Sequence, residues 1–197
     1  MRPETEAELA EIVRGANAPL SVRGGGTRHV PAAGEPLTVS GLTGITLYEP
    51  GALTLVARAG TPVAEVEAAL AAEGQRLPFE PMDHRGLLGT EGAPTIGGAV
   101  AMNVSGPRRV QAGACRDSLI GVRFVDGEGT VVKNGGRVMK NVTGYDLVKL
   151  LAGSRGSLGV LTEVSFKVLP AAATQATLRL DGLKVADAVR AMAAGLS

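Results

Sequence analysis

The chain has 197 residues, a formal net charge of +1, 45% hydrophobic and 20% charged residues, values typical of one globular domain. The balanced charge, together with only 3% aromatic residues, argues against a nucleic-acid surface. Cys115 is the single cysteine, which excludes an intrachain disulfide and an iron–sulfur cluster held by this chain alone. The polar start does not resemble a signal peptide, and no apolar run approaches the roughly 18 residues that span a bilayer. We therefore expect a cytoplasmic protein without direct membrane insertion.

Glycine is the unusual part of the composition. The chain has 28 glycines, about twice the usual share of about 7%. They gather at 24–26, 97–98, 135–136 and 153–159, between segments that predict regular structure. Glycine clusters inside a folded domain indicate backbone that turns sharply or approaches another group closely.

The first half of the chain predicts an alternation of helices and strands. Thr5 and Glu8 form a capping-box pattern that begins a helix over about 5–17. Further elements are a strand at 20–23, strands near 37–39, 45–48 and 53–59, and a helix from Thr61 and Pro62 to Gly74.

The second half opens with residues 77–118, which are rich in Gly and Pro and poor in periodic pattern. Long irregular stretches in compact domains are commonly binding loops. Residues 120–133 then predict a β-hairpin, Asp146 caps a short helix, residues 160–168 alternate as a long strand, and residues 183–192 predict a terminal helix.

The segment SVRGGGTRH at 21–29 runs a strand into three glycines. Such a loop can bring successive N–H groups together into a nest that binds a diphosphate. It is neither a Walker A loop nor a Rossmann fingerprint, because the required spacing and residues are missing. On its own, a tight surface turn explains it equally well.

Two further glycine segments share this ambiguity. TIGGAVAMNVSGP at 95–107 would suit a flat ligand lying against backbone, or the close packing of a buried helix. GRVMKNVTGYDLVKLLAGSRGSLGVLTE at 136–163 is either a binding segment or an ordinary loop–helix–strand connection. The ordinary interpretations do not explain why all these clusters occur in one short chain.

Taken together, these blocks resemble the FAD-binding domain of the vanillyl-alcohol oxidase-type flavoproteins, and most closely the FAD-binding subunits of glycolate oxidases. The resemblance runs from about Arg2 to Pro170 and keeps the order of the blocks. It implies an α+β fold, a two-lobed PCMH-type FAD-binding domain over 1–170 with subdomains of about 1–75 and 76–170. Residues 171–197 would begin a truncated substrate domain.

The resemblance also implies a set of cofactor-binding residues. The pyrophosphate would lie on Arg23, Gly24, Gly25, Gly26 and Thr27. The ribityl and isoalloxazine parts would contact Thr95, Ile96, Gly97, Gly98, Asn103, Ser105 and Gly106, followed by Arg116 and Asp117. Gly159, Val160 and Leu161 would present backbone to the cofactor, and Lys140 would neutralise phosphate or flavin charge.

The attachment of the cofactor is expected to be non-covalent. Covalent members of such families often carry a His directly after the paired glycines of the first loop, where this chain has Thr27 and places His29 two residues later. His29 and His84 lie far apart in loop-like sequence, so no metal site is expected. Cys115 is interpreted as a small buried residue, and Arg108 with Arg109 as an exposed pair or a clamp for a substrate carboxylate.

The implied activity is oxidation of a small α-hydroxy acid such as glycolate, with hydride passing to the flavin; no catalytic residue is assigned. The alternative is a non-catalytic flavin carrier or scaffold in a multi-subunit dehydrogenase complex. Implied partners are the other subunits of a glycolate oxidase-type complex, including an iron–sulfur subunit, which could hold the chain at the inner membrane. A plain ADP or NAD module is a third possibility.

Overall fold

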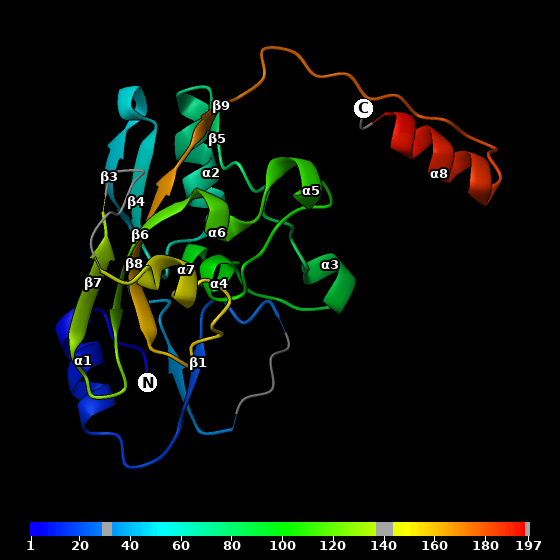
Figure 1. The fold of residues 1–197 in the computed structure, drawn as a ribbon. Coiled ribbons are helices and arrows are strands. Elements are labelled where there is room, and N and C mark those ends of the chain that lie inside the picture. The colour runs from blue at the N-terminus through cyan, green and yellow to red at the C-terminus, as the bar shows by residue number, and fades with distance from the viewer. Residues whose placement is uncertain (29–32, 137–143, 196–197) are drawn as a thin grey trace.

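A five-stranded antiparallel sheet forms the centre of the protein (Figure 1). The structure, a computed structural model, describes residues 1–28, 33–136 and 144–195. The strand order is β3 (Ile45–Glu49), β4 (Thr54–Arg58), β8 (Val160–Lys167), β6 (Leu119–Val125) and β7 (Val131–Gly135). The central strand β8 pairs with β4 on one side and with β6 on the other. The sheet therefore takes strands from both sides of residue 75.

Two small sheets flank the main one. β1 (Leu20–Arg23) pairs in parallel with β2 (Glu35–Thr38), and β5 (Gln75–Arg76) pairs antiparallel with β9 (Leu169–Pro170). The chain crosses from β1 to β2 through the triple-glycine segment, so the parallel pair holds this segment at its end.

The main hydrophobic cluster fills one face of the sheet. Its helical cover comes from α2 (Val63–Ala72), α4 (Ile96–Ala101) and α7 (Leu147–Leu151). The rings of Phe79 and Phe166 meet there with centroids 5.6 Å apart, a favourable aromatic contact.

A second cluster lies under α1 (Glu6–Arg14) and contains Leu9, Val13, Leu37, Val125 and Val160. Side chains alternate along a strand, and β6 accordingly sends Val122 and Phe124 into the main cluster and Val125 into the second. The expected α+β class is confirmed.

Most expected elements are present, with two corrections. Residues 77–118 are not irregular throughout, because they contain α3 (Arg85–Leu88), α4, α5 (Arg109–Ala112) and α6 (Cys115–Ser118). Thr61 does not cap α2: its hydroxyl lies 2.7 Å from the Arg58 carbonyl and accepts from the Gly44 N–H at 2.9 Å. Thr5 does cap α1, accepting from the Glu8 N–H at 3.2 Å.

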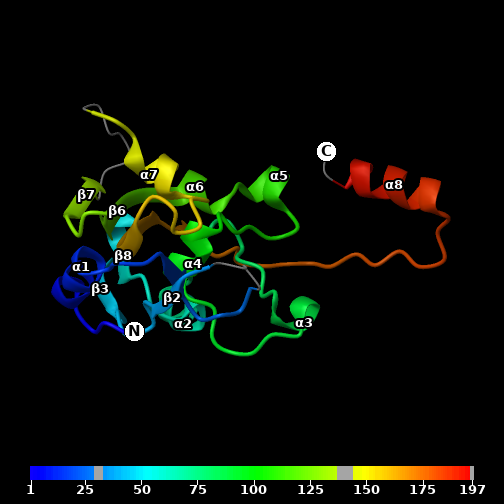
Figure 2. The same cartoon turned by 90° about the horizontal axis from the view of Figure 1, so that it is seen from below.

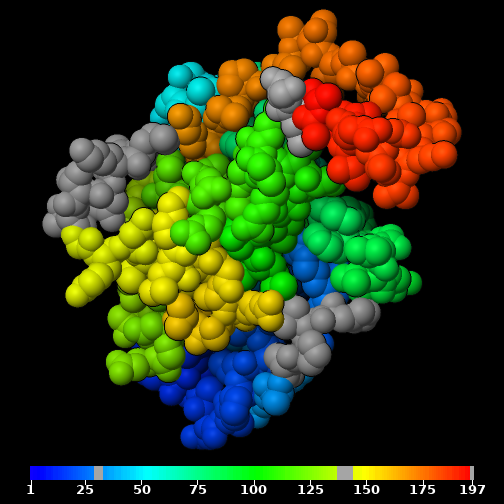
Figure 3. Space-filling view, turned by 45° about the vertical axis from the view of Figure 1, so that its right-hand side comes forward, coloured from blue at the N-terminus to red at the C-terminus, as the bar shows by residue number. Residues whose placement is uncertain are grey.

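Beyond β9 the chain leaves the sheet domain as an exposed arm that ends in α8 (Val185–Ala194) (Figures 1 and 2). Every residue from 171 to 186 is exposed, and α8 has no buried residue. The space-filling view shows these orange to red residues as a separate lobe at the edge of the body (Figure 3). Among the helices of the described ranges, none has the length and apolar composition needed to cross a membrane.

Candidate functional site

A cavity of about 340 Å³ lies where the two hydrophobic clusters meet. Val39 and Val160 line it from the second cluster, and Ala59 and Leu161 line it from the main one. Residues 22–28, which contain the triple-glycine segment, form another wall. The volume lies within the range of small-molecule sites.

The glycine loop is packed too closely for side chains at two of its positions. A Cβ atom on Gly24 would lie 2.3 Å from Thr95 Oγ1, and one on Gly25 would lie 1.6 Å from the Ala93 carbonyl oxygen. Gly26 differs, because its φ is +70° and a Cβ there would have open space around it. The first two glycines therefore permit close packing, and Gly26 permits the left-handed turn.

The amides of this loop are unusual because they lack protein partners. Within the described residues, the backbone N–H groups of Gly24, Gly25, Gly26 and Thr27 donate no hydrogen bond. Gly24 and Gly25 are half-buried, Gly26 is exposed and Thr27 is buried. Successive unpaired backbone donors in a loop that lines a cavity indicate a site for an acceptor.

The neighbouring helix α4 does not supply such donors. The N–H groups of Ile96 and Gly97 donate to the carbonyls of Thr61 (2.9 Å) and Ala59 (2.8 Å), and the N–H of Gly98 donates to Thr95 Oγ1 (3.2 Å). Gly97 is needed for packing, because a Cβ there would lie 2.6 Å from the Ala59 Cβ. The glycine loop, and not α4, is therefore the donor of amides at this site.

A third wall comes from the segment that precedes β8. Arg155 adopts a φ of +56°, rare for a residue with a side chain, and its N–H donates to the Ala101 carbonyl at 2.9 Å. A Cβ on Gly156 would meet Val22 at 3.2 Å, so this segment lies directly against β1. Ser154 Oγ is buried and has no hydrogen-bond partner among the described residues.

The charged side chains that line the cavity are all positive. They are Arg23, Arg28 and Arg155, and in the part of the chain that the structure describes no Asp, Glu, Lys, His, Cys or Tyr lines it. None of the three arginines forms an ion pair with another described residue. Burial lowers the pKa of Arg28, which means that its charge is partly removed from water. Such a wall favours an anionic ligand.

Eleven of the expected site residues line this one cavity. They come from three separate segments of the chain: Arg23, Gly24, Gly25, Gly26, Thr27, Thr95, Gly97, Gly98, Gly159, Val160 and Leu161. Their convergence is the main geometric finding, because the first and the last of these segments lie more than a hundred positions apart in the sequence.

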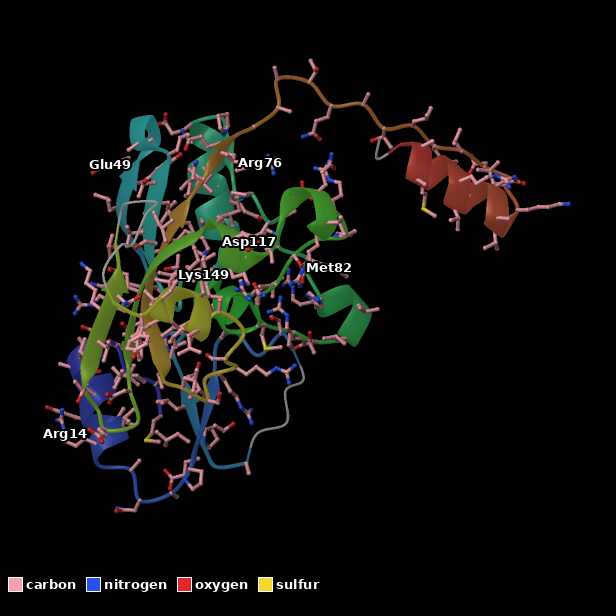
Figure 4. The ribbon with its side chains drawn as sticks, in the orientation of Figure 1. Arg14, Glu49, Arg76, Met82, Asp117 and Lys149 are labelled. Atoms are coloured by element: carbon pink, nitrogen blue, oxygen red, sulfur yellow. The ribbon has the colours of Figure 1, made fainter. Side chains whose placement is uncertain are left out.

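Other expected residues lie outside the cavity wall. Ile96 is fully buried in the main cluster. Asn103 Oδ1 accepts from the Arg116 N–H at 3.0 Å, and Asp117 Oδ2 accepts from the Ala114 N–H at 2.8 Å, so both serve local structure. Near Asp117, Lys149 on α7 donates to backbone carbonyls of α6 and β6 (Figure 4).

Three expected positions remain to be placed. Gly106 packs on the Glu80 backbone, where a Cβ would lie 2.6 Å from the carbonyl oxygen, and Ser105 is half-buried beside it without lining the cavity. Lys140 lies outside the described residues, as does His29.

Several lining residues were not expected from the sequence: Val22, Arg28, Val39, Ala59, Ala101, Met102, Ser154, Arg155 and Gly156. Val22, Arg28 and Met102 are direct sequence neighbours of expected residues, whereas the other six are not. The signal for Arg28 was its position after the glycine loop, and the signal for Arg155 was its place among closely spaced glycines.

The remaining candidate groups lie elsewhere. Cys115 is fully buried in the main cluster, and this burial raises the pKa of its thiol far above the usual value. Arg108 pairs with Glu80, with Nε 3.1 Å from Oε2, and this hydrogen bond lowers the pKa of Glu80. Arg108 is therefore already engaged, and Cys115 is not a reactive nucleophile.

Comparison with known proteins gives the site a context. A family model described as FAD binding domain matches residues 1–135. The chain is 44% identical over 164 residues to glycolate oxidase subunit GlcE of Escherichia coli, covering 82% of this chain and 45% of that protein. It is 42% identical over 84 residues to glycolate oxidase subunit GlcD of Bacillus subtilis (43% and 18% covered). It is 29% identical over 178 residues to D-lactate dehydrogenase of Archaeoglobus fulgidus (86% and 38% covered).

The chain thus spans less than half the length of each of these relatives. The family match covers more than half of the chain and includes the glycine loop, β1, β2, β4 and α4. The protein belongs to the FAD binding domain family, and its cofactor is FAD.

Proposed function

We propose that this chain holds FAD in the cavity described above, as the flavin-binding part of an oxidoreductase that acts on an α-hydroxy acid such as glycolate. The observation that carries the proposal is the run of unpaired amides at Gly24–Thr27 beside a purely cationic wall. The names of the relatives, two glycolate oxidase subunits and a D-lactate dehydrogenase, support the substrate class.

The residues present fit the cofactor. A diphosphate needs convergent N–H donors and positive charge, and the glycine loop and three arginines supply both. The open space around Gly26 leaves the backbone accessible to close approach, and Ser154 Oγ adds a buried polar atom without a partner among the described residues. When bound, FAD supplies the hydride-accepting chemistry, whereas the chain supplies position and electrostatics.

In this proposal each segment of the cavity wall contacts a different part of FAD. Residues 23–27 hold the pyrophosphate, and residues 159–161 lie against its other parts. The ribityl and isoalloxazine groups follow the wall formed by residues 95–98 toward Asn103, Ser105, Gly106, Arg116 and Asp117. Residues 171–197 begin a substrate domain, which agrees with an arm that leaves the sheet domain fully exposed.

We propose that the cofactor is held without a covalent bond. Thr27 lines the cavity where a histidyl link would require a His, and Cys115 lies in the core away from the cavity. Acid precipitation of the yellow protein tests this. Colour should stay in the supernatant, whereas a yellow pellet would show that a covalent anchor exists.

The substrate proposal is tested by anaerobic titration of the FAD-loaded chain. If the chain itself takes part in α-hydroxy-acid oxidation, glycolate or D-lactate should bleach the flavin absorbance. Visible absorbance also separates this function from a plain ADP or NAD module, which would carry no flavin colour. Bleaching by dithionite alone would contradict the catalytic form of the proposal for the isolated chain.

A second candidate is a flavin-carrying subunit whose substrate chemistry depends on other chains. One observation favours it: among the described residues that line the cavity, none is able to act as a general base near neutral pH. In this form the chain assembles with the other subunits of a glycolate oxidase-type complex, including an iron–sulfur subunit, on the cytoplasmic side of the inner membrane. Glycolate bleaching that appears only after the partner subunits are added would support it.

A further inference from the structure

Arg28 is a charged residue at the cavity with no counter-ion. It follows the glycine loop directly, lines the cavity, and its Nε is buried without a hydrogen-bond partner. All Asp and Glu residues of the chain fall within the described ranges, and none forms an ion pair with Arg28. A half-buried guanidinium without a carboxylate is uncommon, since desolvation makes an unpaired charge costly.

The acidic residue whose charge acts on Arg28 is Asp83, but the Asp83 carboxylate is hydrogen-bonded to Arg85. Arg85 Nε and Nη2 lie 3.1 and 2.8 Å from the two oxygens of the Asp83 carboxylate. These hydrogen bonds lower the pKa of Asp83 to about 2. The Asp83 charge is therefore already balanced by a partner other than Arg28.

Within the described ranges Arg28 has one hydrogen-bond contact, and another group competes for the same ring nitrogen. Its Nη2 lies 3.2 Å from His84 Nδ1, and the same nitrogen lies 2.8 Å from the carbonyl oxygen of Met82, the residue labelled beside α3 in Figure 4. A ring nitrogen either donates a proton or accepts one. If Nδ1 donates to Met82 it cannot accept from Arg28, so most N–H donors of this guanidinium have no acceptor among the described residues.

Arg23 and Arg155 also line the cavity, but both are exposed and solvated. Arg28 is the most buried of the three, and an ion pair gains most where water is excluded. We propose that Arg28 neutralises the diphosphate of bound FAD and thereby makes the site selective for the dinucleotide over flavins that lack a diphosphate. This inference rests on the proposal that FAD occupies the cavity.

The test compares FAD, riboflavin and ADP binding to the full chain carrying Arg28→Gln. Flavin affinity is measured by fluorescence quenching, and ADP affinity by competition with FAD. Losing hydrogen bonds from a charged group should weaken FAD and ADP by about 10- to 150-fold. Riboflavin, which has no phosphate, should bind the variant as it binds the wild type. Arg28→Lys keeps the charge without the planar fork and should fall between the two.

Two controls separate this role from a structural one. Arg190→Gln removes an exposed arginine of α8 that does not line the cavity and should leave all three affinities unchanged. The melting temperature of apo Arg28→Gln should equal or exceed that of the wild type, because an uncompensated charge is removed. A lower apo melting temperature, with riboflavin weakened as much as FAD, would overturn the inference.

The outcomes also distinguish this inference from the proposed function. Unimpaired FAD binding by Arg28→Gln would overturn the role of Arg28 alone, because the wild type and the variant would then hold FAD equally. A wild-type chain that binds neither FAD nor riboflavin would overturn the proposed function and this inference with it.

Discussion

At the scale of single residues, Gly26 combines a left-handed conformation with open space. Gly26→Val should cost about 1–3 kcal/mol of backbone strain. It should also place a branched side chain at the unpaired amides. Because bound FAD requires the left-handed conformation that valine strains, FAD loading should fall about five- to 150-fold or more. The measurement is the flavin absorbance of the purified variant together with its melting temperature.

Gly74→Val is the matched control, because Gly74 has a φ of +63° and equally open space but does not line the cavity. Both variants should lose similar stability, and only Gly26→Val should lose flavin. Full flavin loading of Gly26→Val would remove the glycine loop from the proposed binding site.

Some residues of the site could be predicted from the sequence and others could not. The glycine clusters could be recognised in the sequence because each is visible without knowledge of the residues that it packs against. Most of these glycines line the cavity as expected. Ala59 and Met102 carry no chemical signal, and only the pairing of β4 with β8 and the packing of α4 place them there. The unpaired state of Arg28 depends on Arg85 holding Asp83, a contact between side chains that no motif records.

At the scale of elements, a polar link fastens α1 to the sheet. The Glu6 carboxylate accepts from Arg123 Nε on β6 at 3.1 Å and from the Thr162 hydroxyl on β8 at 2.6 Å. The hydrogen bond from Arg123 is the largest cause of a lowered Glu6 pKa. A carboxyl whose pKa is depressed by folding stabilises the fold above its ordinary pKa and loses this contribution as the pH falls.

Glu6→Gln should therefore lower the melting temperature at pH 7, where the wild-type carboxylate is ionised. The difference between the two proteins should shrink as the pH drops through the ordinary value of 4.5 and below the lowered one. Glu11→Gln on the exposed side of α1 serves as the control. A difference that stays constant from pH 7 to pH 3 would show that the charge of Glu6 does not contribute.

The exposed arm allows a second prediction about elements. Because α8 buries no residue, a chain ending at Ala171 should keep the melting temperature and FAD affinity of the full chain. Ala171 itself is kept, since its N–H donates to the Gly74 carbonyl at 2.7 Å. Differential scanning calorimetry and flavin titration measure both quantities, and a marked loss of either would mean that α8 packs on the sheet domain in solution.

Long helices and strands could be predicted from the sequence more readily than short ones. The alternation of β8 and the hairpin of β6 and β7 were visible in the sequence, because eight and seven residues establish a period. The short helices α3, α5 and α6 have four residues each, too few to show one. The two-residue pair of β5 and β9 is specified by tertiary packing rather than by any local pattern.

At the scale of the whole molecule, the sheet depends on a strand beyond the family match. The match ends at residue 135, yet β8 at Val160–Lys167 lies between β4 and β6. A chain ending at Gly135 should therefore lack cooperative thermal unfolding and should not retain FAD. Circular dichroism and flavin absorbance test this, with the chain ending at Ala171 as the folded reference. A sharp transition in the shorter chain would show that β4 and β6 find another arrangement.

The central place of β8 also has a consequence during synthesis. About a hundred residues separate the end of β4 at Arg58 from the start of β8 at Val160. At a translation rate of about 5–20 residues per second, roughly 5–20 s pass between the synthesis of β4 and that of its partner strand β8. During this interval its apolar faces and one strand edge stay uncovered, which is the condition under which nascent chains aggregate. The topology that builds the cavity from distant segments therefore leaves the growing chain open to aggregation until β8, the last strand of the main sheet, emerges.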